Sequence, residues 1–464
     1  MEHEFDVVVV GAGPAGEVAA GRLRSRGNRR VALVERDLVG GECSFYACMP
    51  SKALLRPMEL LREAQRIPGA AQAISGELDV QAVLERRDQV ISDLDDSRQL
   101  PWIEKREIAL FRGSGRLDGE RRVLVGDQVL SAREAVILAP GSTAAMPSIP
   151  GLAEAGAWSN RQITTAKEVP PRLTILGGGI VGVEMAQAWA SLGSTVTVIE
   201  AQERLIATEE PFVGEQVGTA LTEMGIQVRL GAKARAVRRA GQEITVELED
   251  GFTVSAERLL VAVGRKPLTE DLGLESVGLE AGGFIEVDDH LQVPGHPWLY
   301  AVGDVNGRSL LTHAGKYQAR IAVERILGSQ TAKATADGPR SPRVVFTDPH
   351  VAAVGLTLEA AQSAGLKVVA VDLPTGGSAG ASFVGRGTET TSRFVVDTER
   401  GVLVGVTFVG PAMAESLHAA TIAIIGEVPL TTLAHAIAAF PTRSELWLSF
   451  LEEYERRRGV SVHR

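Results

Sequence analysis

The sequence predicts an α/β fold with two parallel-sheet domains and a C-terminal α+β domain. Two segments, 6–36 and 172–200, each run from an apolar strand through closely spaced glycines and a helix into a second strand. From Val344 onward, alternating apolar runs such as RFVVD and GVLVGVTFVG are typical of an antiparallel sheet, and helical patterns follow Met413. A chain of 464 residues is also longer than one hydrophobic core usually serves, so several domains are expected.

The segment 6–36 has the layout of a Rossmann dinucleotide site. Its apolar strand leads into Gly11, Gly13 and Gly16, and an alanine-rich helix and a second strand ending at Glu35 follow. In this layout the glycines make a tight turn, let the backbone approach a pyrophosphate and let the helix pack on the strand. An acid about twenty residues further on binds a ribose hydroxyl. The segment is therefore predicted to bind a dinucleotide.

The second segment repeats this Rossmann-like layout, with Gly177, Gly179 and Gly182 at the turn and Glu200 at the end of its second strand. An acid at that end favours a free ribose hydroxyl over a phosphate, so we expect NADH to be preferred to NADPH. Arg204 follows four residues later and could contact a phosphate, but a helix-capping or salt-bridge role is favoured. Two dinucleotides in one chain indicate an electron path from nicotinamide to a flavin and onward.

Charge and composition argue against other classes of protein. The net charge is −10, and no basic stripe suited to nucleic acid is evident. After Met1 the chain passes through a few polar residues into an apolar strand that is too short to span a membrane and lacks the features of a secretion signal. We therefore expect a cytoplasmic protein that binds neither nucleic acid nor a membrane.

The chain has two cysteines, Cys43 and Cys48, and both lie in the stretch GGECSFYACMPSK at 40–52. Two thiols at this spacing in an intracellular chain indicate redox or metal chemistry instead of a disulfide scaffold. Zinc requires four ligands, and the neighbouring sequence supplies no further cysteine or histidine. A redox disulfide is therefore favoured over a zinc site and over two small buried apolar residues, and no metal is expected.

Five ordered motifs resemble those of the pyridine nucleotide-disulfide oxidoreductases, a family that includes lipoamide dehydrogenase and mercuric reductase. They are the cysteine stretch at 40–52, APGS at 139–142, AVGDV around Asp304, TDP at 347–349 and FPTRSE at 440–445. The resemblance extends over essentially the whole chain. It implies an oxidoreductase flavoprotein with FAD, NADH, a redox-active disulfide and a homodimer.

The resemblance also implies a role for each residue near the flavin. Cys48 would lie against the flavin as the charge-transfer thiol, and Cys43 would face the substrate. Lys52, one helical turn beyond Cys48, would approach the flavin and pair with Glu184, and Asp304 would bind the ribityl chain. A positive charge there would stabilise the reduced flavin and lower the pKa of a thiol. Further implied contacts are Ala15, Gly41, Lys52, Gly141, Gly303 and His313 for FAD, and Gly264 for NAD.

The last motif departs from the family pattern at its first position. Thiol-exchange members have a catalytic histidine where this chain has Phe440, whereas Pro441, Thr442 and Glu445 match. A phenyl ring cannot transfer a proton, and general acid–base catalysis contributes ~10²–10⁴-fold, so fast reduction of an ordinary disulfide is not expected. The same phenylalanine is found in 2-ketopropyl coenzyme M oxidoreductase/carboxylase. His435 points to a different helical face and is interpreted as a structural or surface residue.

The motifs and the resemblance together predict how the chain is divided. An FAD-binding domain is expected over 1–150, an NAD(P)-binding domain over 151–270, a central segment completing the FAD domain over 271–338 and a dimerisation domain over 339–464. In the family, the last domain lends its tail motif to the neighbouring subunit. The phenylalanine and glutamate of 440–445 would then complete the partner's active site, and a monomer would be catalytically incomplete.

Three functions are compatible with these features. The leading hypothesis is an FAD-dependent NAD(P)H oxidoreductase, similar to an atypical dihydrolipoamide dehydrogenase. Its electrons would pass from nicotinamide through FAD to the Cys43–Cys48 disulfide and then to a small-molecule acceptor that the sequence does not identify. In the second hypothesis the flavin reduces quinones or metal ions directly and the disulfide is a bystander. The third is a flavin redox sensor whose disulfide state alters its affinity for a partner.

Overall fold

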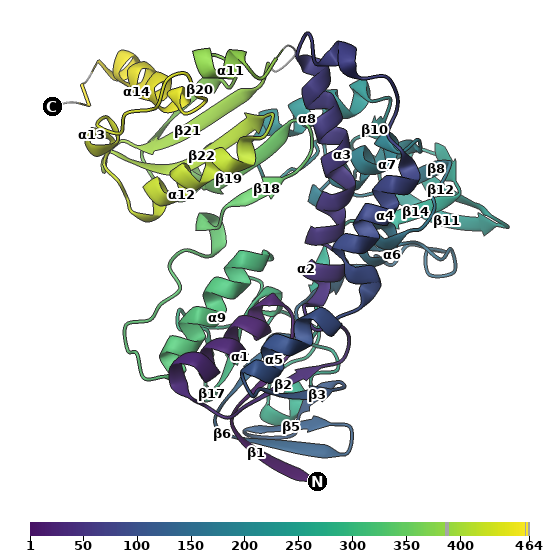
Figure 1. Cartoon of the computed structure of the whole chain (residues 1–464), viewed down its shortest axis with the longest axis vertical. Coiled ribbons are helices and arrows are strands. Elements are labelled where there is room, and N and C mark those ends of the chain that lie inside the picture. Colours follow the sequence, from purple (N-terminus) through teal and green to yellow (C-terminus); the bar gives the residue numbers. More distant parts are fainter. Residues whose placement is uncertain (386–388, 460, 463–464) are drawn as a thin grey trace. The chain divides into compact units, whose positions relative to one another are not determined.

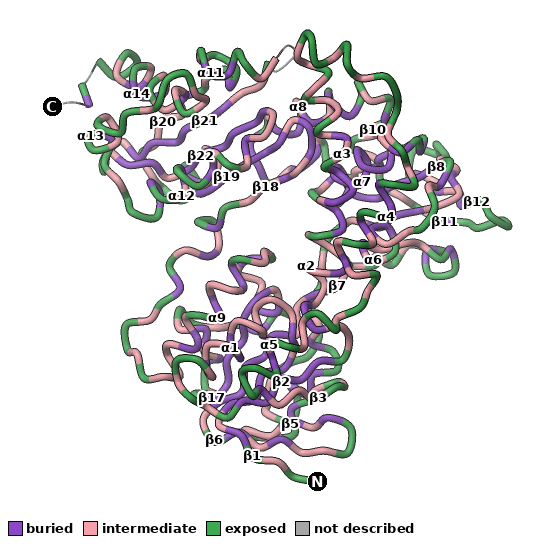
Figure 2. The backbone as a smooth tube through the Cα atoms, viewed as in Figure 1, coloured by how far each residue is buried: buried purple, intermediate pink, exposed green. Residues whose placement is uncertain are grey.

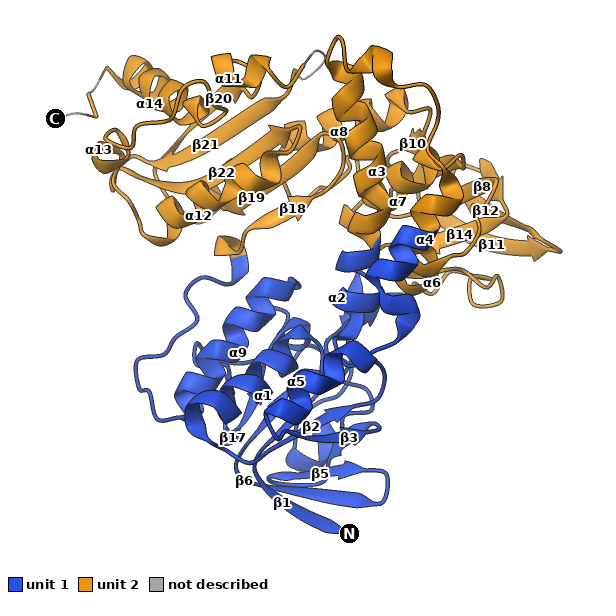
Figure 3. Cartoon of the chain, viewed as in Figure 1, with its two compact units in different colours: residues 1–50, 85–145, 264–338 blue, residues 51–84, 146–263, 339–464 orange. Residues whose placement is uncertain are grey.

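The computed structural model describes residues 1–385, 389–459 and 461–462, and the chain divides into two compact units (Figure 3). Each unit combines three stretches of the chain, which are 1–50, 85–145 and 264–338 for unit 1 and 51–84, 146–263 and 339–464 for unit 2. Segments far apart in the sequence therefore meet within one unit. The domain limits given above stay predictions.

Unit 1 is built on a sheet of eight strands, counted among the described residues (Figure 1). Its main path is β16-β17-β6-β1-β2-β3, in which the pairs from β17 to β3 are parallel, and β5 and β4 continue from β6 as antiparallel strands. A separate antiparallel pair joins β7 to β15. The strands are β1 (Glu2–Val10), β2 (Val31–Glu35), β3 (Ala109–Arg112), β4 (Gly115–Leu117), β5 (Arg122–Val125), β6 (Gln128–Leu138), β7 (Ser142–Ala144), β15 (Arg265–Pro267), β16 (Gln292–Val293) and β17 (His296–Ala301).

Two helices of unit 1, α1 and α9, pack together on one face of this sheet. Val7 and Val9 of β1 belong to the same apolar cluster as Ala19 of α1 and Ala319 of α9, while Val8 faces a second cluster on the opposite side. A strand that is apolar on both faces is typical of a parallel sheet covered on both sides. The helices of this unit are α1 (Pro14–Gly27), α2 (Gly41–Phe45), α5 (Leu100–Lys105) and α9 (Thr312–Ile326).

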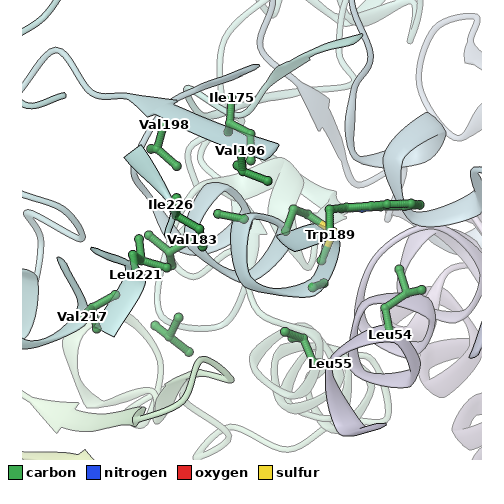
Figure 4. Packing of buried hydrophobic residues seen from close by; sticks show 14 of the residues in the cluster. Leu54, Leu55, Ile175, Val183, Trp189, Val196, Val198, Val217, Leu221 and Ile226 are labelled. Carbon is green, nitrogen blue, oxygen red and sulfur yellow. The ribbon is translucent and has the colours of Figure 1, made fainter. Parts of the chain in front are cut away.

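Unit 2 contains a second parallel sheet, with the order β10-β9-β8-β14, and an antiparallel sheet, β11-β12-β13. Its core surrounds α7, where the fully buried Trp189 shares a cluster with Leu54 and Leu55 of α3 (Figure 4). Two helices, α3 (Cys48–Arg66) and α4 (Val80–Val90), are shared with unit 1, which contains their residues 48–50 and 85–90. The other elements are α6 (Asn160–Thr165), β8 (Arg172–Leu176), α7 (Ile180–Ser191), β9 (Thr195–Ile199), α8 (Pro211–Glu223), β10 (Gln227–Arg229), β11 (Ala234–Ala240), β12 (Glu243–Leu248), β13 (Thr253–Ala256) and β14 (Arg258–Val261).

The C-terminal part of unit 2 is an antiparallel sheet with the order β18-β19-β22-β21-β20, and its three central strands are largely buried (Figure 2). Phe394 on the sheet stacks on Phe450 of α14 with 4.2 Å between the ring centroids. The elements are β18 (Arg343–Val345), β19 (His350–Gly355), α10 (Leu358–Ser363), β20 (Val368–Pro374), α11 (Ala379–Ser382), β21 (Thr391–Asp397), β22 (Val402–Gly410), α12 (Leu417–Ile425), α13 (Leu430–Leu433) and α14 (Glu445–Arg458).

The predicted fold class is confirmed, because two parallel sheets follow the glycine motifs and an antiparallel sheet with helices ends the chain. Each parallel sheet starts from one of the two strand–glycine–helix segments found in the sequence. Within the described residues, no helix has both the length and the apolar character that crossing a membrane requires.

Candidate active site

The first glycine turn links β1 to α1 in unit 1. Gly11 has φ +101°, and a Cβ there would lie 2.2 Å from the carbonyl oxygen of Ala139. A Cβ at Gly16 would lie 1.8 Å from the carbonyl oxygen of Gly11, so the helix packs directly on the turn. Gly13 precedes the first residue of α1 and has no side chain to cap the helix. The first N–H groups of α1 can therefore receive a pyrophosphate, which fits the diphosphate of FAD.

Glu35 ends β2 beside this turn, and its carboxylate is held by two backbone groups. Oε2 accepts a hydrogen bond from the N–H of Ala12 at 2.7 Å, and Oε1 accepts one from the N–H of Asp37 at 2.7 Å. Each carboxylate oxygen retains capacity for a further hydrogen bond. The geometry fits the recognition of the adenosine ribose of FAD.

The second glycine turn, in unit 2, has the same construction. Gly177 has φ +109°, and a Cβ at Gly182 would lie 1.9 Å from the carbonyl oxygen of Gly177. Glu200 accepts hydrogen bonds from the N–H groups of Gly178 at 2.5 Å and of Gln202 at 2.7 Å.

Two further residues, Gly179 and Arg204, were singled out from the second motif. Gly179 precedes the first residue of α7, as Gly13 precedes α1. The guanidinium of Arg204 donates to the carbonyl oxygen of Ala207 at 3.3 Å, which accords with the structural interpretation of this residue.

In unit 1, both cysteines contact the same hydroxyl group. Cys43 lies in α2, Cys48 begins α3, and both are half-buried thiols in this structure. The hydroxyl of Thr312, the first residue of α9, donates to Cys43 Sγ at 3.1 Å and lies 3.4 Å from Cys48 Sγ. Sequence reasoning missed Thr312, because no motif links it to the cysteines, which lie 269 and 264 residues earlier in the chain.

The thiol of Cys43 holds its proton tightly. The hydrogen bond with Cys48 raises the pKa of Cys43 well above its usual value, and burial and the charge of Cys48 raise it further. The hydrogen bond from Thr312 and the charge of Lys316 act in the opposite direction but do not outweigh these causes. Cys43 therefore requires a nearby proton acceptor before it can act as a nucleophile.

Lys52 and Glu184 form an ion pair within unit 2, as the resemblance implied. The Lys52 ammonium lies 3.0 Å and 2.7 Å from the two oxygens of Glu184, which is buried. The N–H of Phe346 also donates to Glu184 at 2.9 Å, and the Phe346 ring centroid lies 4.7 Å from the ammonium. These contacts fix the charged end of Lys52, which stands four residues after Cys48 in helix α3.

Asp304 sits in a polar group of unit 1. Its Oδ2 accepts a hydrogen bond from the hydroxyl of Ser142 at 2.5 Å, and Arg265 donates to that hydroxyl at 2.7 Å. Arg265 also forms an ion pair with Glu42 of α2. Burial raises the pKa of Asp304, while the Ser142 bond and the Arg265 charge oppose that effect.

The remaining predicted nucleotide contacts take varied places in unit 1. Ala15 lies in the first turn of α1, and Gly41 begins α2 so close to the first turn that a Cβ would lie 2.7 Å from Gly13 Cα. Gly141 precedes β7 with φ +78°, and His313 is an exposed residue of α9. Two others are Gly303, before Asp304, and Gly264, before β15 and outside the unit that holds the second glycine turn.

The tail motif has an exposed phenylalanine and an engaged carboxylate. Phe440 is 77% exposed in the chain as described. Glu445 Oε1 accepts hydrogen bonds from the N–H groups of Thr442 at 2.9 Å and of Gly380 at 3.0 Å. A Cβ at Gly380 would lie 2.1 Å from the carbonyl carbon of Thr442, so α11 packs directly on the tail motif. The catalytic roles of Phe440 and Glu445 stay predictions.

Two family descriptions match the chain. "Pyridine nucleotide-disulphide oxidoreductase" matches residues 5–319, and "Pyridine nucleotide-disulphide oxidoreductase, dimerisation domain" matches residues 341–449. Together these matches include both glycine turns, both cysteines, Thr312 and the tail motif.

The chain is similar to named enzymes over nearly its whole length. It is 32% identical to dihydrolipoyl dehydrogenase 3 of Pseudomonas aeruginosa over an alignment of 463 positions, which covers 96% of this chain and 97% of that enzyme. It is 31% identical to mercuric reductase of Staphylococcus aureus, covering 96% of this chain and 81% of that enzyme. A solved structure of the HOCl-induced flavoprotein disulfide reductase RclA from Escherichia coli has the same fold, with a TM-score of 0.84, 24% identity and coverage of 96% and 99%.

Proposed function

The chain belongs to the pyridine nucleotide-disulphide oxidoreductase family, and from this premise we propose that it moves electrons from NADH through FAD to the Cys43–Cys48 pair and then to a small-molecule acceptor. Its membership makes it a flavoprotein oxidoreductase that uses a pyridine nucleotide. The preference for NADH, the use of the cysteine pair and the choice of acceptor are the parts proposed.

One observation carries the proposal: the two thiols share the Thr312 hydroxyl, at 3.1 Å from Cys43 Sγ and 3.4 Å from Cys48 Sγ. Bound FAD would supply the conversion of a hydride from NADH into two electrons that can open a disulfide. Two sulfurs gathered on one hydroxyl can form that disulfide with little rearrangement. Reduction then leaves two thiols that share one polar partner.

The first turn and its neighbours would hold the FAD. The N–H groups of α1 fit the pyrophosphate, and Glu35 fits the adenosine ribose. Asp304, fixed by Ser142, is suited to a hydroxyl of the ribityl chain. Glu200 would hold the ribose of NADH in the second turn, where its carboxylate would repel a 2′-phosphate.

The tail motif limits which electron acceptors the enzyme can reduce. Phe440 cannot take the proton that a histidine would take, and Glu445 Oε1 already accepts two backbone hydrogen bonds. Because Glu445 orders the tail motif in this way, we assign it a positioning role. The enzyme should therefore favour an acceptor whose reduction needs no proton transfer from this motif. The C-terminal domain fits a homodimer in which this motif reaches the partner's thiols.

An anaerobic titration of the purified flavoprotein with NADH tests the electron path, with Cys43→Ser as the control. In the native protein the first two electrons should enter the cysteine pair, leaving the flavin largely oxidised with a long-wavelength thiolate band. In Cys43→Ser the first equivalent should bleach the flavin. Identical bleaching in both proteins would contradict the proposal.

A second function is favoured by the raised pKa of Cys43, which makes Cys43 a poor nucleophile in the reduced pair. In that case the flavin would reduce quinones or metal ions directly. Full NADH-dependent activity with such acceptors in Cys43→Ser would support this function, whereas loss of activity with every acceptor would leave the cysteine path in place.

A further inference from the structure

We infer that Thr312 relays a proton between the two thiols, so that Cys43 is activated by Cys48 instead of by a histidine. The inference deepens the proposed function and rests on it, because the relay matters to turnover only if Cys43 reacts with the acceptor. Two observations carry it. The Thr312 hydroxyl is within hydrogen-bond distance of both sulfurs. The tail motif has Phe440 at the position where, by the family resemblance, thiol-exchange enzymes have a catalytic histidine.

A hydroxyl is suited to this task because it can donate one hydrogen bond and accept another at the same time. Thr312 is the first residue of α9, so its backbone is fixed by the helix while its hydroxyl can rotate between two partners. The distances of 3.1 Å and 3.4 Å are within the usual range for hydrogen bonds that involve sulfur. The hydroxyl can therefore donate to whichever sulfur is ionised.

The relay balances in protons and involves no oxidation. In the reduced pair the proton resides on Cys43 and the charge on Cys48, which accords with the raised pKa of Cys43. Cys43 S–H then gives its proton to the Thr312 oxygen as the hydroxyl proton of Thr312 passes to Cys48 Sγ. The products are a Cys43 thiolate and a Cys48 thiol, with the Thr312 hydroxyl restored.

The charges around this pair support the direction of transfer. Lys316 lies one turn beyond Thr312 on α9, and its charge favours the Cys43 thiolate. On α2, Glu42 would disfavour that thiolate, but its carboxylate is paired with Arg265. The neighbouring His313 is exposed and lies about 100° around the helix from Thr312. Among these described neighbours, Thr312 is the group that contacts both sulfurs.

Alkylation of the reduced holoenzyme with iodoacetamide, resolved by mass spectrometry at Cys43 and at Cys48 across pH 6–10, tests the relay. The variants are Thr312→Val, which lacks the hydroxyl, and Thr312→Ser, which keeps it. In Thr312→Val the Cys43 alkylation rate at pH 7 should fall about tenfold, and its rate–pH profile should shift upward by about one pH unit, since a hydrogen bond to a charged group contributes about that much. Thr312→Ser should stay within about threefold of the native rate.

Reduction with dithiothreitol, removed before labelling, separates this test from the electron path, because the thiols then form whether or not NADH can reduce them. Flavin content and thermal unfolding show whether Thr312→Val folds, and Thr312→Ala replaces it if it does not. Native alkylation rates and an unchanged rate–pH profile in the folded variant would overturn the relay and show that the sulfurs exchange the proton directly. An equal loss of reactivity at both cysteines in Thr312→Ser would also overturn it, because that pattern reports a packing role.

Discussion

The two glycine turns, one in each unit, have nearly the same backbone and bury different side chains. Gly11 and Gly177 have φ +101° and +109°, and a Cβ on either would lie 2.2 Å or 2.4 Å from a carbonyl oxygen. Glu35 and Glu200 each accept two backbone N–H bonds at the end of the second strand. The parts proposed to contact a nucleotide are therefore set by backbone geometry, which is nearly the same in both turns.

The difference appears at the sixth residue after the first glycine of each turn. In unit 2 this residue is Val183, which is fully buried. In unit 1 it is Glu17, whose Oε1 is buried and has no hydrogen-bond partner among the described residues. Burial raises the pKa of Glu17 to about 7, with Lys316 opposing the rise and Glu35 adding to it. Helix α1 thus has, in place of an apolar side chain such as Val183 of α7, an acid that can remain protonated near neutral pH.

The largest expected effect comes from removing the backbone freedom that the two turns share. Gly11→Ala and Gly177→Ala each place a Cβ against a carbonyl oxygen in a strained backbone conformation. Each should therefore lower the affinity for the nucleotide at its own turn by about a hundredfold or more. Gly11→Ala should be purified with little flavin, as its absorbance would show. Gly177→Ala should keep its flavin, which dithionite but not NADH would bleach. Loss of flavin from both variants would show that the turns are not independent.

A smaller effect is expected from Glu17, the residue that distinguishes the turns. Its ordinary pKa of 4.5 rises to about 7 in the fold, so the folded chain binds more protons than the unfolded chain between these values. The free energy of unfolding should therefore fall as pH rises from 4.5 to 7, by about 2–3 kcal/mol between pH 5 and pH 8 from this group.

Denaturant unfolding of the native protein and of Glu17→Gln at pH 5 and pH 8 measures this contribution. The variant should be the more stable protein at pH 8 and should lose most of the pH dependence. Glu17→Val, which copies the residue of the second helix, is the matched control for packing. If native protein and Glu17→Gln show the same pH dependence, Glu17 does not titrate in this range.

The smallest expected effect concerns the acids that the turns have in common. Glu200→Gln removes the negative charge while one side-chain oxygen can still accept a backbone hydrogen bond, so the fold should be kept. The ratio of kcat/KM for NADH over NADPH should fall about tenfold, because the repulsion of a 2′-phosphate is lost. Flavin content should not change. An unaltered ratio would show that another residue determines the preference.

The features that could be predicted from the sequence are the local ones. Both glycine turns and both acids lie within about 25 residues of their strands, so spacing alone reveals them. The Lys52–Glu184 pair spans 132 residues and was expected only because a family resemblance supplied it. The spacing of residues within a short motif cannot predict a pair whose members lie so far apart in the sequence.

Thr312 and the surroundings of Glu445 show what the sequence could not reveal. Thr312 contacts Cys43 across 269 residues, through the return of α9 to unit 1, and no motif marks that contact. The catalytic role of Glu445 stays a prediction, and nothing in the sequence indicated that its Oε1 accepts N–H bonds from its own loop and from Gly380 of α11.

Glu35 and Glu200, which each accept two backbone hydrogen bonds, should also affect how a nucleotide binds. Because both oxygens of Glu35 and of Glu200 are already engaged with the backbone, neither side chain has rotamers left to lose when a ribose arrives. These carboxylates lose their side-chain entropy during folding and not on nucleotide binding, so the two sites are preorganised. Nucleotide affinity at each site should then persist until the turn itself unfolds, instead of declining gradually as side chains gain motion on warming.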